Sequence, residues 1–315
     1  MLFFILEADN LVSVLCKALS FLVIIILGYM LKKRGTFKEG FRDAVTFIAL
    51  NLTLPAAIIS SFVSFEKNNS LFVLMLMGLL INFFMLFVGF IFSLGKERDV
   101  KVLYMMNCPG YNIGSFCMPF IQGFLGSQGV VATCMFDTGN ALMTCGGSYA
   151  VTSACLGSGS EKFGFADFIK KMFCSVPFDT YLIAILLAVF NIKIPEPLGN
   201  FISTTASANG FMAMLMLGLS LDFNIDKKYY GEIGRMLFIK YLICAALALL
   251  IYFVLPFDTM IKHVLTIVVF SPTSALVPAF TQKLGSNTEA AAFAGSVSIV
   301  ISIIIMVVLV TVINP

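Results

Sequence analysis

The sequence predicts an all-α integral membrane protein with ten transmembrane helices, and three observations support this fold class. Of the 315 residues, 59% are hydrophobic and only 12% are charged, whereas a soluble domain carries about 25% charged residues. Long apolar runs recur along the whole chain. Basic residues gather in alternate connections between these runs. A soluble fold could not cover so much apolar surface, so the lipid bilayer is the expected surrounding, and nothing in the sequence resembles a nucleic-acid-binding surface.

Ten stretches meet the length that a membrane span requires, which is about 20 mainly apolar residues. The predicted spans are 11–31, 42–63, 70–94, 100–125, 129–153, 176–194, 198–221, 233–255, 261–284 and 290–313. The N-terminus has Glu7 and Asp9 where a secretory signal would be basic, and no small-residue cleavage site follows. The first span is therefore expected to be retained.

The basic residues orient these spans. Fifteen lie in the odd-numbered connections: Lys32, Lys33, Arg34, Lys38, Arg42, Lys96, Arg98, Lys101, Lys162, Lys170, Lys171, Lys227, Lys228, Arg235 and Lys283. The other side has only Lys67, Lys193 and Lys262. The positive-inside rule then places the odd-numbered connections in the cytoplasm and both termini outside a plasma or inner cell membrane. Lys17 and Lys240 fall within spans, and each is expected to snorkel to a nearby end.

The linker between spans five and six is predicted to contain an amphipathic helix on the inner leaflet. Its apolar residues follow helical spacing: Phe165, Phe168, Ile169, Met172 and Phe173. Asp167, Lys170 and Lys171 fall on the opposite face. The expected division is a first half at 1–155, a cytoplasmic linker at 156–175 and a second half at 176–315. We expect a plain connector, with a signalling role as the alternative.

A short internal repeat relates the two halves. Residues 119–128 read PFIQGFLGSQ and residues 278–287 read PAFTQKLGSN, an offset of 159. The same offset carries each of the first five spans onto one of the last five. Because each half then has an odd number of spans, the halves are expected to be inverted repeats, an architecture of secondary transporters.

Spans four and nine contain residues that interrupt a helix. Span four has Asn107, Pro109, Gly110, Asn112, Gly114 and Ser115, and span nine has Ser271, Pro272, Thr273 and Ser274. Proline removes a backbone donor and clashes with the preceding turn. Half-helices are expected to begin near Ile113 and Leu276, where free N–H groups and the helix dipole favour an anion such as a carboxylate. The alternative is a pair of proline kinks without a ligand.

Asp137 is the one acidic residue predicted to lie deep inside a span. Thr133, Asn140, Thr144 and Ser148 share its helical face. A buried carboxylate is costly unless it is protonated or paired, so Asp137 and Asn140 are candidates for a proton or coupling-ion site. The alternative is an Asp137 carboxylate locked to Asn140 or to backbone donors freed by the break. Asn51, in span two, is a candidate for the substrate path, with helix packing as its alternative.

The sequence does not favour an enzyme. The eight cysteines lack metal-ligand spacing to a histidine and are expected to be free thiols. The single histidine, His263, is not part of an HExxH motif. We therefore expect no cofactor, no metal and no catalytic residue.

Several motifs resemble the auxin efflux carrier family, which includes plant PIN-formed carriers and bacterial malate or malonate permeases. They are NLTLPAAIISS from Asn51, NIGSFCMP from Asn112 with FLGSQGVVATCMFDTGN after it, MLMLGLSL from Met214, and SPTSA from Ser271 with LGSNTEAA downstream. The family stretch usually has Gly at Cys117 and Thr at Ile113, and these departures concern the shape of the pocket.

The resemblance implies a fold similar to the bile-acid sodium symporters. Spans one, two, six and seven would form a scaffold, and spans three to five and eight to ten a moving transport domain, with spans four and nine crossing at the substrate site. It implies elevator-like alternating access and homodimers through the scaffold. By motif, Pro109, Asn112, Asp137 and Pro272 fall at the crossover.

The resulting expectation is a secondary active transporter or uniporter for small organic anions such as malate, malonate or auxin-like acids. A channel, a transport-derived membrane sensor and a cation-coupled symporter of a related family are the alternatives. Asp137 makes proton coupling the favoured form. Sodium coupling is disfavoured because the broken segments lack further acidic ligands. Import or export follows the gradients rather than the residues.

Overall fold

The computed structural model describes residues 2–35, 40–62, 70–157, 169–170, 172–190, 192–223 and 227–313. Within these ranges all the regular secondary structure is helical, and the only β-type pairing is an isolated antiparallel bridge between Tyr111 and Thr273. The predicted all-α class is confirmed. The helices carry apolar side chains that can face lipid. Helices are also favoured in a bilayer because each one satisfies its own backbone hydrogen bonds.

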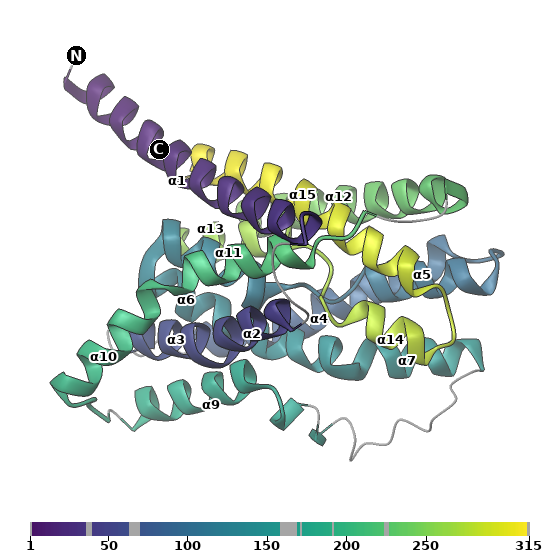
Figure 1. Cartoon of the computed structure of the whole chain (residues 1–315), viewed down its shortest axis with the longest axis horizontal. Helices are drawn as coiled ribbons and strands as arrows, with labels where there is room; N and C mark the ends of the chain where they lie inside the picture. The colour runs from purple at the N-terminus through teal and green to yellow at the C-terminus, as the bar shows by residue number, and fades with distance from the viewer. Residues whose placement is uncertain are drawn as a thin grey trace.

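Figure 1 shows the helices in chain order. They are α1 (Leu2–Lys33), α2 (Phe41–Ile48), η1 (Ala49–Thr53), α3 (Leu54–Phe62), α4 (Ser70–Phe92), α5 (Arg98–Asn107), η2 (Ile113–Cys117), α6 (Met118–Leu142), η3 (Met143–Gly147), α7 (Ser148–Leu156), α9 (Val176–Val189), α10 (Glu196–Ser207), α11 (Asn209–Ser220), η4 (Lys227–Tyr229), α12 (Tyr230–Phe253), α13 (Thr259–Val268), α14 (Val277–Lys283) and α15 (Thr288–Ile313).

Six helical stretches among the described residues are long and apolar enough to cross a membrane. They are Val14–Lys33, Phe41–Phe62, Phe72–Phe92, Glu196–Ser220, Tyr230–Phe253 and Thr288–Ile313. They coincide with predicted spans one, two, three, seven, eight and ten, which confirms a protein with several membrane-spanning helices.

The other four predicted spans have identifiable reasons for falling outside this group. Spans four and nine are interrupted between α5 and η2 and between α13 and α14. Span five is part of α6, which turns at Gly126 (φ 63°, ψ −160°) and contains Asp137 and Asn140. Span six is the apolar helix α9, which has only 14 residues.

The helices pack in two sets of neighbours. In one set α1 packs on α11, and α3 packs on α9 and α10. In the other set α4 packs on α5 and α6, α13 packs on α6 and α12, and α14 packs on α15. Contacts of α6 with α3, α9 and α11 join the two sets. The main buried core draws on both sets, so α6 is central to the packing of the whole chain.

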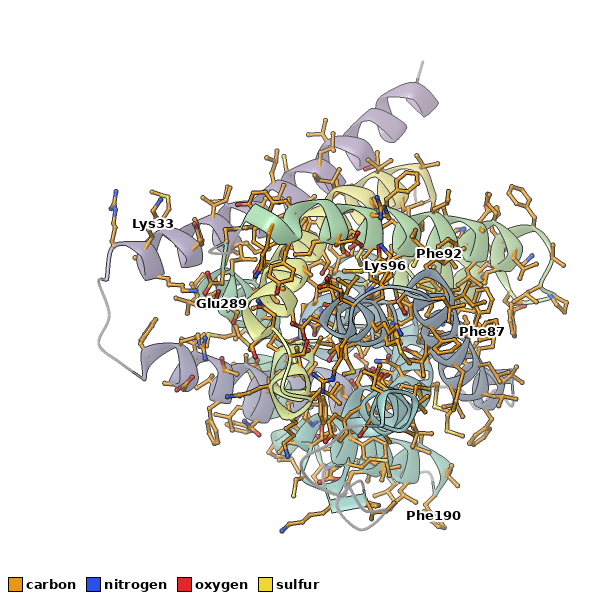
Figure 2. The ribbon with its side chains drawn as sticks, turned by 90° about the vertical axis from the view of Figure 1, so that its right-hand side faces the viewer. Lys33, Phe87, Phe92, Lys96, Phe190 and Glu289 are labelled. Atoms are coloured by element: carbon orange, nitrogen blue, oxygen red, sulfur yellow. The ribbon has the colours of Figure 1, made fainter. Side chains whose placement is uncertain are left out.

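Large apolar side chains on the periphery point away from the core. Figure 2 shows Phe87, Phe92 and Phe190 at the outside of the molecule, and their exposed fractions are 57%, 47% and 69%. Charged groups such as Lys33 and Glu289 lie near helix ends. An apolar exterior of this kind is unfavourable in water and is expected for helices that face lipid.

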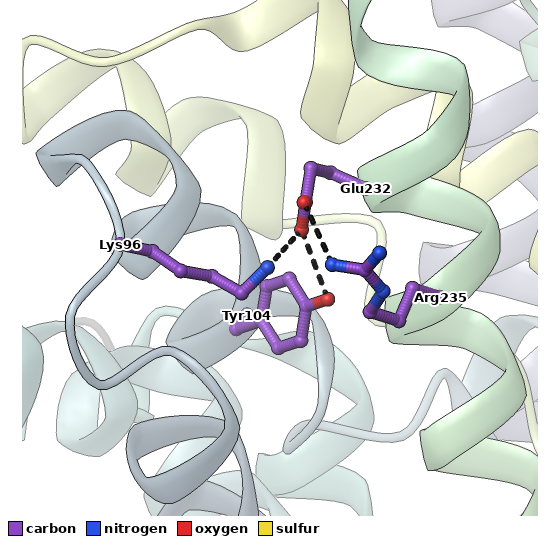
Figure 3. A network of polar contacts seen from close by, with 4 residues as sticks. All are labelled: Lys96, Tyr104, Glu232 and Arg235. Carbon is purple, nitrogen blue, oxygen red and sulfur yellow. Dashed lines mark hydrogen bonds and ion pairs between the residues drawn. The ribbon is translucent and has the colours of Figure 1, made fainter.

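A polar cluster joins the connection after α4 to the start of α12. Glu232 accepts from Lys96 Nζ at 2.6 Å, from the Tyr104 hydroxyl at 3.1 Å and from Arg235 Nη1 at 3.1 Å (Figure 3). The side chains of Lys96 and Glu232 are 21% and 28% exposed, so water partly screens the pair. The cluster fixes one end of α12 against α5.

The predicted linker helix lies largely outside the described residues, which exclude Phe165, Asp167, Phe168 and Lys171. The described residues Ile169, Lys170, Met172 and Phe173 are helical. Met172 is buried against Ala141, Cys145 and Phe178. The end of the linker therefore packs on α6, η3 and α9. All eight cysteines are free thiols, as predicted.

The prediction that Lys240 snorkels is wrong. Its side chain is fully buried, and Nζ donates to the Asn107 carbonyl oxygen and to Thr273 Oγ1, each at 3.0 Å. Lys240 is the eleventh residue of α12, so about 15 Å of helix precedes it at 1.5 Å per residue. The ammonium therefore turns into the protein, where the Asn107 carbonyl oxygen and the Thr273 hydroxyl accept its hydrogen bonds.

Candidate functional site

The first break separates α5, which ends at Asn107, from the π-helical turn η2, which begins at Ile113. Pro109 lies in this gap, and Gly110 has φ of 75°, a left-handed conformation that a side chain would disfavour. The half-helix begins at the residue predicted from the sequence. Cys108 still donates to the Tyr104 carbonyl oxygen of α5, but the N–H groups of Gly110, Tyr111 and Asn112 have no acceptor within either helix and need partners elsewhere.

The second break lies between α13, which ends at Val268, and α14, which begins at Val277, one residue after the predicted start. The two breaks pair with each other. The Asn112 N–H donates to the Pro272 carbonyl oxygen, and the Ser274 N–H donates to the Gly110 carbonyl oxygen, both at 2.8 Å. These reciprocal hydrogen bonds flank the Tyr111–Thr273 bridge. The two interrupted helices therefore meet backbone to backbone.

Two asparagine side chains hold the first break. Asn140 on α6 accepts from the Tyr111 N–H at 3.0 Å and donates to the Tyr111 carbonyl oxygen at 2.9 Å. Asn82 on α4 accepts from the Gly110 N–H at 2.6 Å and donates to Asn140 Oδ1 at 3.1 Å. An amide side chain supplies both a donor and an acceptor, so it can replace the two helical partners that an unwound peptide has lost. We call Asn82 and Asn140 the amide clamp.

Asp137 is joined to the amide clamp and to another helix. Its Oδ1 accepts from Asn140 Nδ2 at 2.7 Å, and its Oδ2 accepts from the Tyr181 hydroxyl of α9 at 2.6 Å. The residue is only 8% exposed. The bond to Asn140 matches the alternative in which Asn140 holds the carboxylate, while the bond to Tyr181 was not anticipated. One carboxylate thus connects the first break with α9.

The second break is held by different chemistry. The Ser298 hydroxyl of α15 accepts from the Thr273 N–H at 3.1 Å, and Thr273 Oγ1 donates to the Asn107 carbonyl oxygen at 3.2 Å. Lys240 donates to this same carbonyl and to Thr273 Oγ1. A hydroxyl from α15 therefore satisfies a peptide of the second break, and an ammonium from α12 joins the Thr273 side chain to the end of α5.

A cavity of about 480 Å³ lies beside the paired breaks. This volume is within the range of about 300–1,000 Å³ that small-molecule sites occupy. Seven of the predicted site residues line it: Asn51, Asn112, Gly114, Ser115, Asp137, Asn140 and Ser274. The other five, Asn107, Pro109, Ser271, Pro272 and Thr273, lie in the breaks but not in the cavity wall.

The cavity offers a mixture of polar groups and apolar surface. The Ser115 hydroxyl donates to Asn112 Oδ1. Gly114 and Ser115 belong to the first turn of η2, where helix N–H groups lack intrahelical acceptors. Ile113 and Phe178 add apolar surface, and the exposed side chain of Lys283 also lines the cavity. This combination suits a small ligand with an anionic end and an apolar body.

Sequence reasoning missed Asn82, Tyr181, Lys240 and Ser298. A signal did exist for Asn82, because a single amide in the middle of a 23-residue apolar helix is costly and indicates a partner. The depth of Lys240 in α12 was a second signal. Tyr181 and Ser298 gave none, because tyrosine and serine are ordinary in membrane helices.

Comparisons with known proteins identify a family for this chain. A family model described as membrane transport protein matches residues 13–158 and 166–313. An uncharacterized transporter of Methanothermobacter thermautotrophicus is 21% identical over 243 residues, which cover 76% of this chain and 78% of that protein. An uncharacterized transporter of Methanocaldococcus jannaschii is 28% identical over 215 residues, covering 64% and 67%.

The family match covers both halves of the chain and all of the residues of the paired breaks, the amide clamp and the cavity. It agrees with the resemblance that the motifs from Asn51, Asn112, Met214 and Ser271 predict. The chain belongs to the membrane transport protein family, that of the auxin efflux carriers.

Proposed function

We propose that the protein is a secondary carrier of small organic anions, with carboxylates such as malate, malonate or auxin-like acids as the substrate class. The observation that carries this proposal is the cavity beside the two paired breaks, where η2 begins at Ile113. Unwound backbone at membrane depth is tolerated where it is buried in protein or lines a cavity, and half-helices at such a place bind substrates in other transporters. No enzymatic role is proposed.

The proposed architecture is ten spans in two inverted halves. Its support is the position of the breaks, in spans four and nine, and their contacts. Spans three and five supply Asn82 and Asn140 to the first break, and spans eight and ten supply Lys240 and Ser298 to the second. In the proposed repeat, span three corresponds to span eight and span five to span ten, so equivalent spans contact equivalent breaks.

The proposed movement is an elevator in which spans three to five and eight to ten slide against spans one, two, six and seven. Its support is that α1 packs on α11 and α3 on α9 and α10 within one proposed body, and α4 packs on α5 and α6 within the other, while contacts of α6 with α3 and of α1 with α15 lie at the proposed sliding surface. The hydrogen bonds Tyr181–Asp137 and Asn209–Gln122 cross between the sets and would have to break during the movement. Lys283 and Cys174, exposed residues of the cavity wall, lie in connections that the positive-inside rule assigns to the cytoplasm, so the cavity faces inward in this proposal.

Asp137 is the proposed proton site. Transport by the wild type is expected to depend on pH, because a protonated and an ionised Asp137 place different charges beside an anion. Asp137→Asn is expected to lose this dependence, which initial-rate uptake into proteoliposomes across a pH series would reveal. An unchanged pH profile in the variant would remove the proton role while leaving the anion carrier in place.

Substrate binding tests the main proposal. Purified protein is titrated with malonate, malate and indole-3-acetate, and counterflow of a binding anion is measured in proteoliposomes. Saturable binding is expected, with a loss of about tenfold or more in Asn112→Ala, because the cavity loses a polar group. Asn200→Ala, the same change at an exposed position of α10, serves as the control.

Three results would contradict the carrier. They are an absence of saturable binding for all three anions, an Asn112→Ala variant with unchanged binding, and an electrical conductance far faster than carrier turnover, which would indicate a channel.

The proposal also includes a homodimer through spans one, two, six and seven in a plasma or inner cell membrane, with both termini outside. A monomeric mass in lipid nanodiscs would exclude the dimer. Terminal tags that do not react with membrane-impermeant reagents added outside intact cells would exclude the proposed orientation.

A further inference from the structure

Lys240 is the only lysine or arginine with a buried side chain among the described residues. Its ammonium donates to the first break at Asn107 and to the second break at Thr273. It also lies 5.6 Å from the centroid of the Tyr111 ring. A neutral amide could make such hydrogen bonds, as Asn140 does at the first break. The choice of a charged group therefore needs a separate explanation.

Lys240 has no carboxylate partner in the part of the chain that the structure describes, since its hydrogen bonds go to a carbonyl and a hydroxyl. A buried charge is strongly unfavourable unless an opposite charge compensates it. The groups around it are Cys108, Cys244 and Tyr111, two thiols and a phenol that are neutral near neutral pH. Any charge that compensates Lys240 therefore comes from beyond this shell.

Asp137 is connected to Tyr111 through Asn140, which bonds both the Asp137 carboxylate and the Tyr111 backbone, and the Tyr111 ring faces Lys240. Asp137 and Tyr111 both line the cavity, so a ligand bound there meets Asp137 directly and has Tyr111 between itself and Lys240. The other groups around Asp137 are Tyr181, Cys117 and Cys134, which are neutral near neutral pH. Lys283 also lines the cavity, but its side chain is exposed and screened by water and salt.

We propose that Lys240 is the specificity-determining cation of the cavity, a fixed positive charge that either the Asp137 carboxylate or a bound substrate carboxylate compensates. This rests on the proposed function as an anion carrier. In the empty protein Asp137 is ionised and balances Lys240. When a substrate carboxylate enters, one negative charge is in excess, and Asp137 takes up a proton from solution. The fixed charge thereby links anion binding to proton binding and disfavours neutral ligands.

A double-mutant cycle separates this charge from the hydrogen bonds that Lys240 makes. Lys240→Gln keeps an N–H donor and removes the charge, whereas Lys240→Arg keeps the charge. Each is combined with Asp137→Asn, and dissociation constants are measured for indole-3-acetate, malonate and the neutral indole-3-acetamide. The full chain is used in nanodiscs at neutral pH, where an ionised Asp137 competes with the ligand as counter-charge for Lys240.

Asp137→Asn is expected to tighten carboxylate binding by about tenfold when residue 240 is Lys or Arg. In the Lys240→Gln background Asp137 has no cation to compensate it and is already protonated, so the gain is expected to fall below about twofold. Indole-3-acetamide should not respond to either change. Equal gains in both backgrounds, or a parallel loss of carboxylate and amide binding in Lys240→Gln, would show that Lys240 is only a structural tie.

Proton uptake gives a second measurement that needs no change at Lys240. Addition of indole-3-acetate to weakly buffered wild type with a pH-indicator dye should remove about one proton per bound anion, and Asp137→Asn should remove none. Carboxylate binding without proton uptake would overturn the shared counter-charge and leave the anion carrier intact. If no carboxylate binds to the wild type, the proposed function fails, and this inference fails with it.

Discussion

The break between α5 and η2 and the break between α13 and α14 share one backbone pairing but depend on different side chains. At the first break, two neutral amides satisfy the unwound peptides, and a carboxylate supports one of them. At the second, the Ser298 hydroxyl accepts from the Thr273 N–H, while the buried Lys240 ammonium donates to the Thr273 hydroxyl and to the Asn107 carbonyl oxygen of the first break. Similar backbone geometry therefore does not require similar residues. It leaves each break free to carry a different charge, with Asp137 at the first and Lys240 at the second.

The largest effect on stability is expected from Asn140→Ala at the first break. The change leaves the Tyr111 N–H without a partner, removes one of the two donors to the Tyr111 carbonyl oxygen and removes a donor from Asp137. Buried polar groups without partners cost about 1–3 kcal/mol each, so we expect a loss of about 3 kcal/mol or more in the free energy of unfolding. Reversible unfolding in mixed detergent micelles measures it.

Asn51→Ala is the matched control for that experiment. Asn51 donates only to the Phe47 carbonyl oxygen of the preceding turn, so its loss should change stability by well under about 1 kcal/mol. Equal losses in the two variants would mean that the amide clamp contributes no more than an ordinary asparagine.

Tyr181→Phe is expected to have the next largest effect. It removes a 2.6 Å hydrogen bond to Asp137 and keeps the ring. Hydrogen bonds to charged groups contribute about 1.5–3 kcal/mol, so we expect a loss of about 2 kcal/mol. Tyr252→Phe is the control, because Tyr252 is partly exposed and stacks on His263 through its ring. A Tyr181→Phe variant as stable as this control would show that Asp137 does not accept the bond as an anion.

Ser298→Ala tests the second break and is expected to be milder. It removes the acceptor of the Thr273 N–H, while the Ser274 N–H keeps its bond to the Gly110 carbonyl. A loss of about 1 kcal/mol in the free energy of unfolding is expected. Thr311→Ala in the same helix is the control, since Thr311 bonds only to its own helix at Val307. A loss larger than that of Asn140→Ala would reverse the ranking of the two breaks.

The smallest effect is expected at the cluster in Figure 3, away from both breaks. Lys96→Met removes the 2.6 Å ion pair with Glu232, but both side chains are partly exposed. Such pairs contribute about 0.2–1 kcal/mol, so we expect about 0.5 kcal/mol at low salt and less at high salt. Unfolding at two salt concentrations measures both values. An effect that is large and independent of salt would show that packing, rather than charge, links α5 to α12.

The breaks themselves could be predicted from the sequence because their causes are local. Pro109 and Pro272 each remove a backbone donor in the middle of a span and clash with the preceding turn, and the predicted starts at Ile113 and Leu276 agree with the observed starts to within one residue. The partners of the breaks could not be predicted in the same way. Whether Asn82, Tyr181 and Ser298 reach a break depends on the rotation and depth of separate helices, which local periodicity does not set.

Lys240 shows how a general rule can mislead. A lysine near a span end usually snorkels because water is the best partner for an ammonium. Here the unwound segment supplies a carbonyl and a hydroxyl inside the protein. A prediction made one residue at a time cannot include this competition, because the acceptors exist only once both breaks have formed.

The reciprocal bonds between Asn112 and Pro272 and between Ser274 and Gly110 have a consequence for chain length. Deleting or inserting one residue in either break would shift its peptides by about 3.8 Å, one Cα–Cα step, relative to the other break. Both bonds would then lose their geometry together, and the change could be repaired only by an equal change in the opposite half. The two halves of this chain can therefore differ in their side chains at the breaks, but the number of residues between the paired peptides of one break has to match the number in the other.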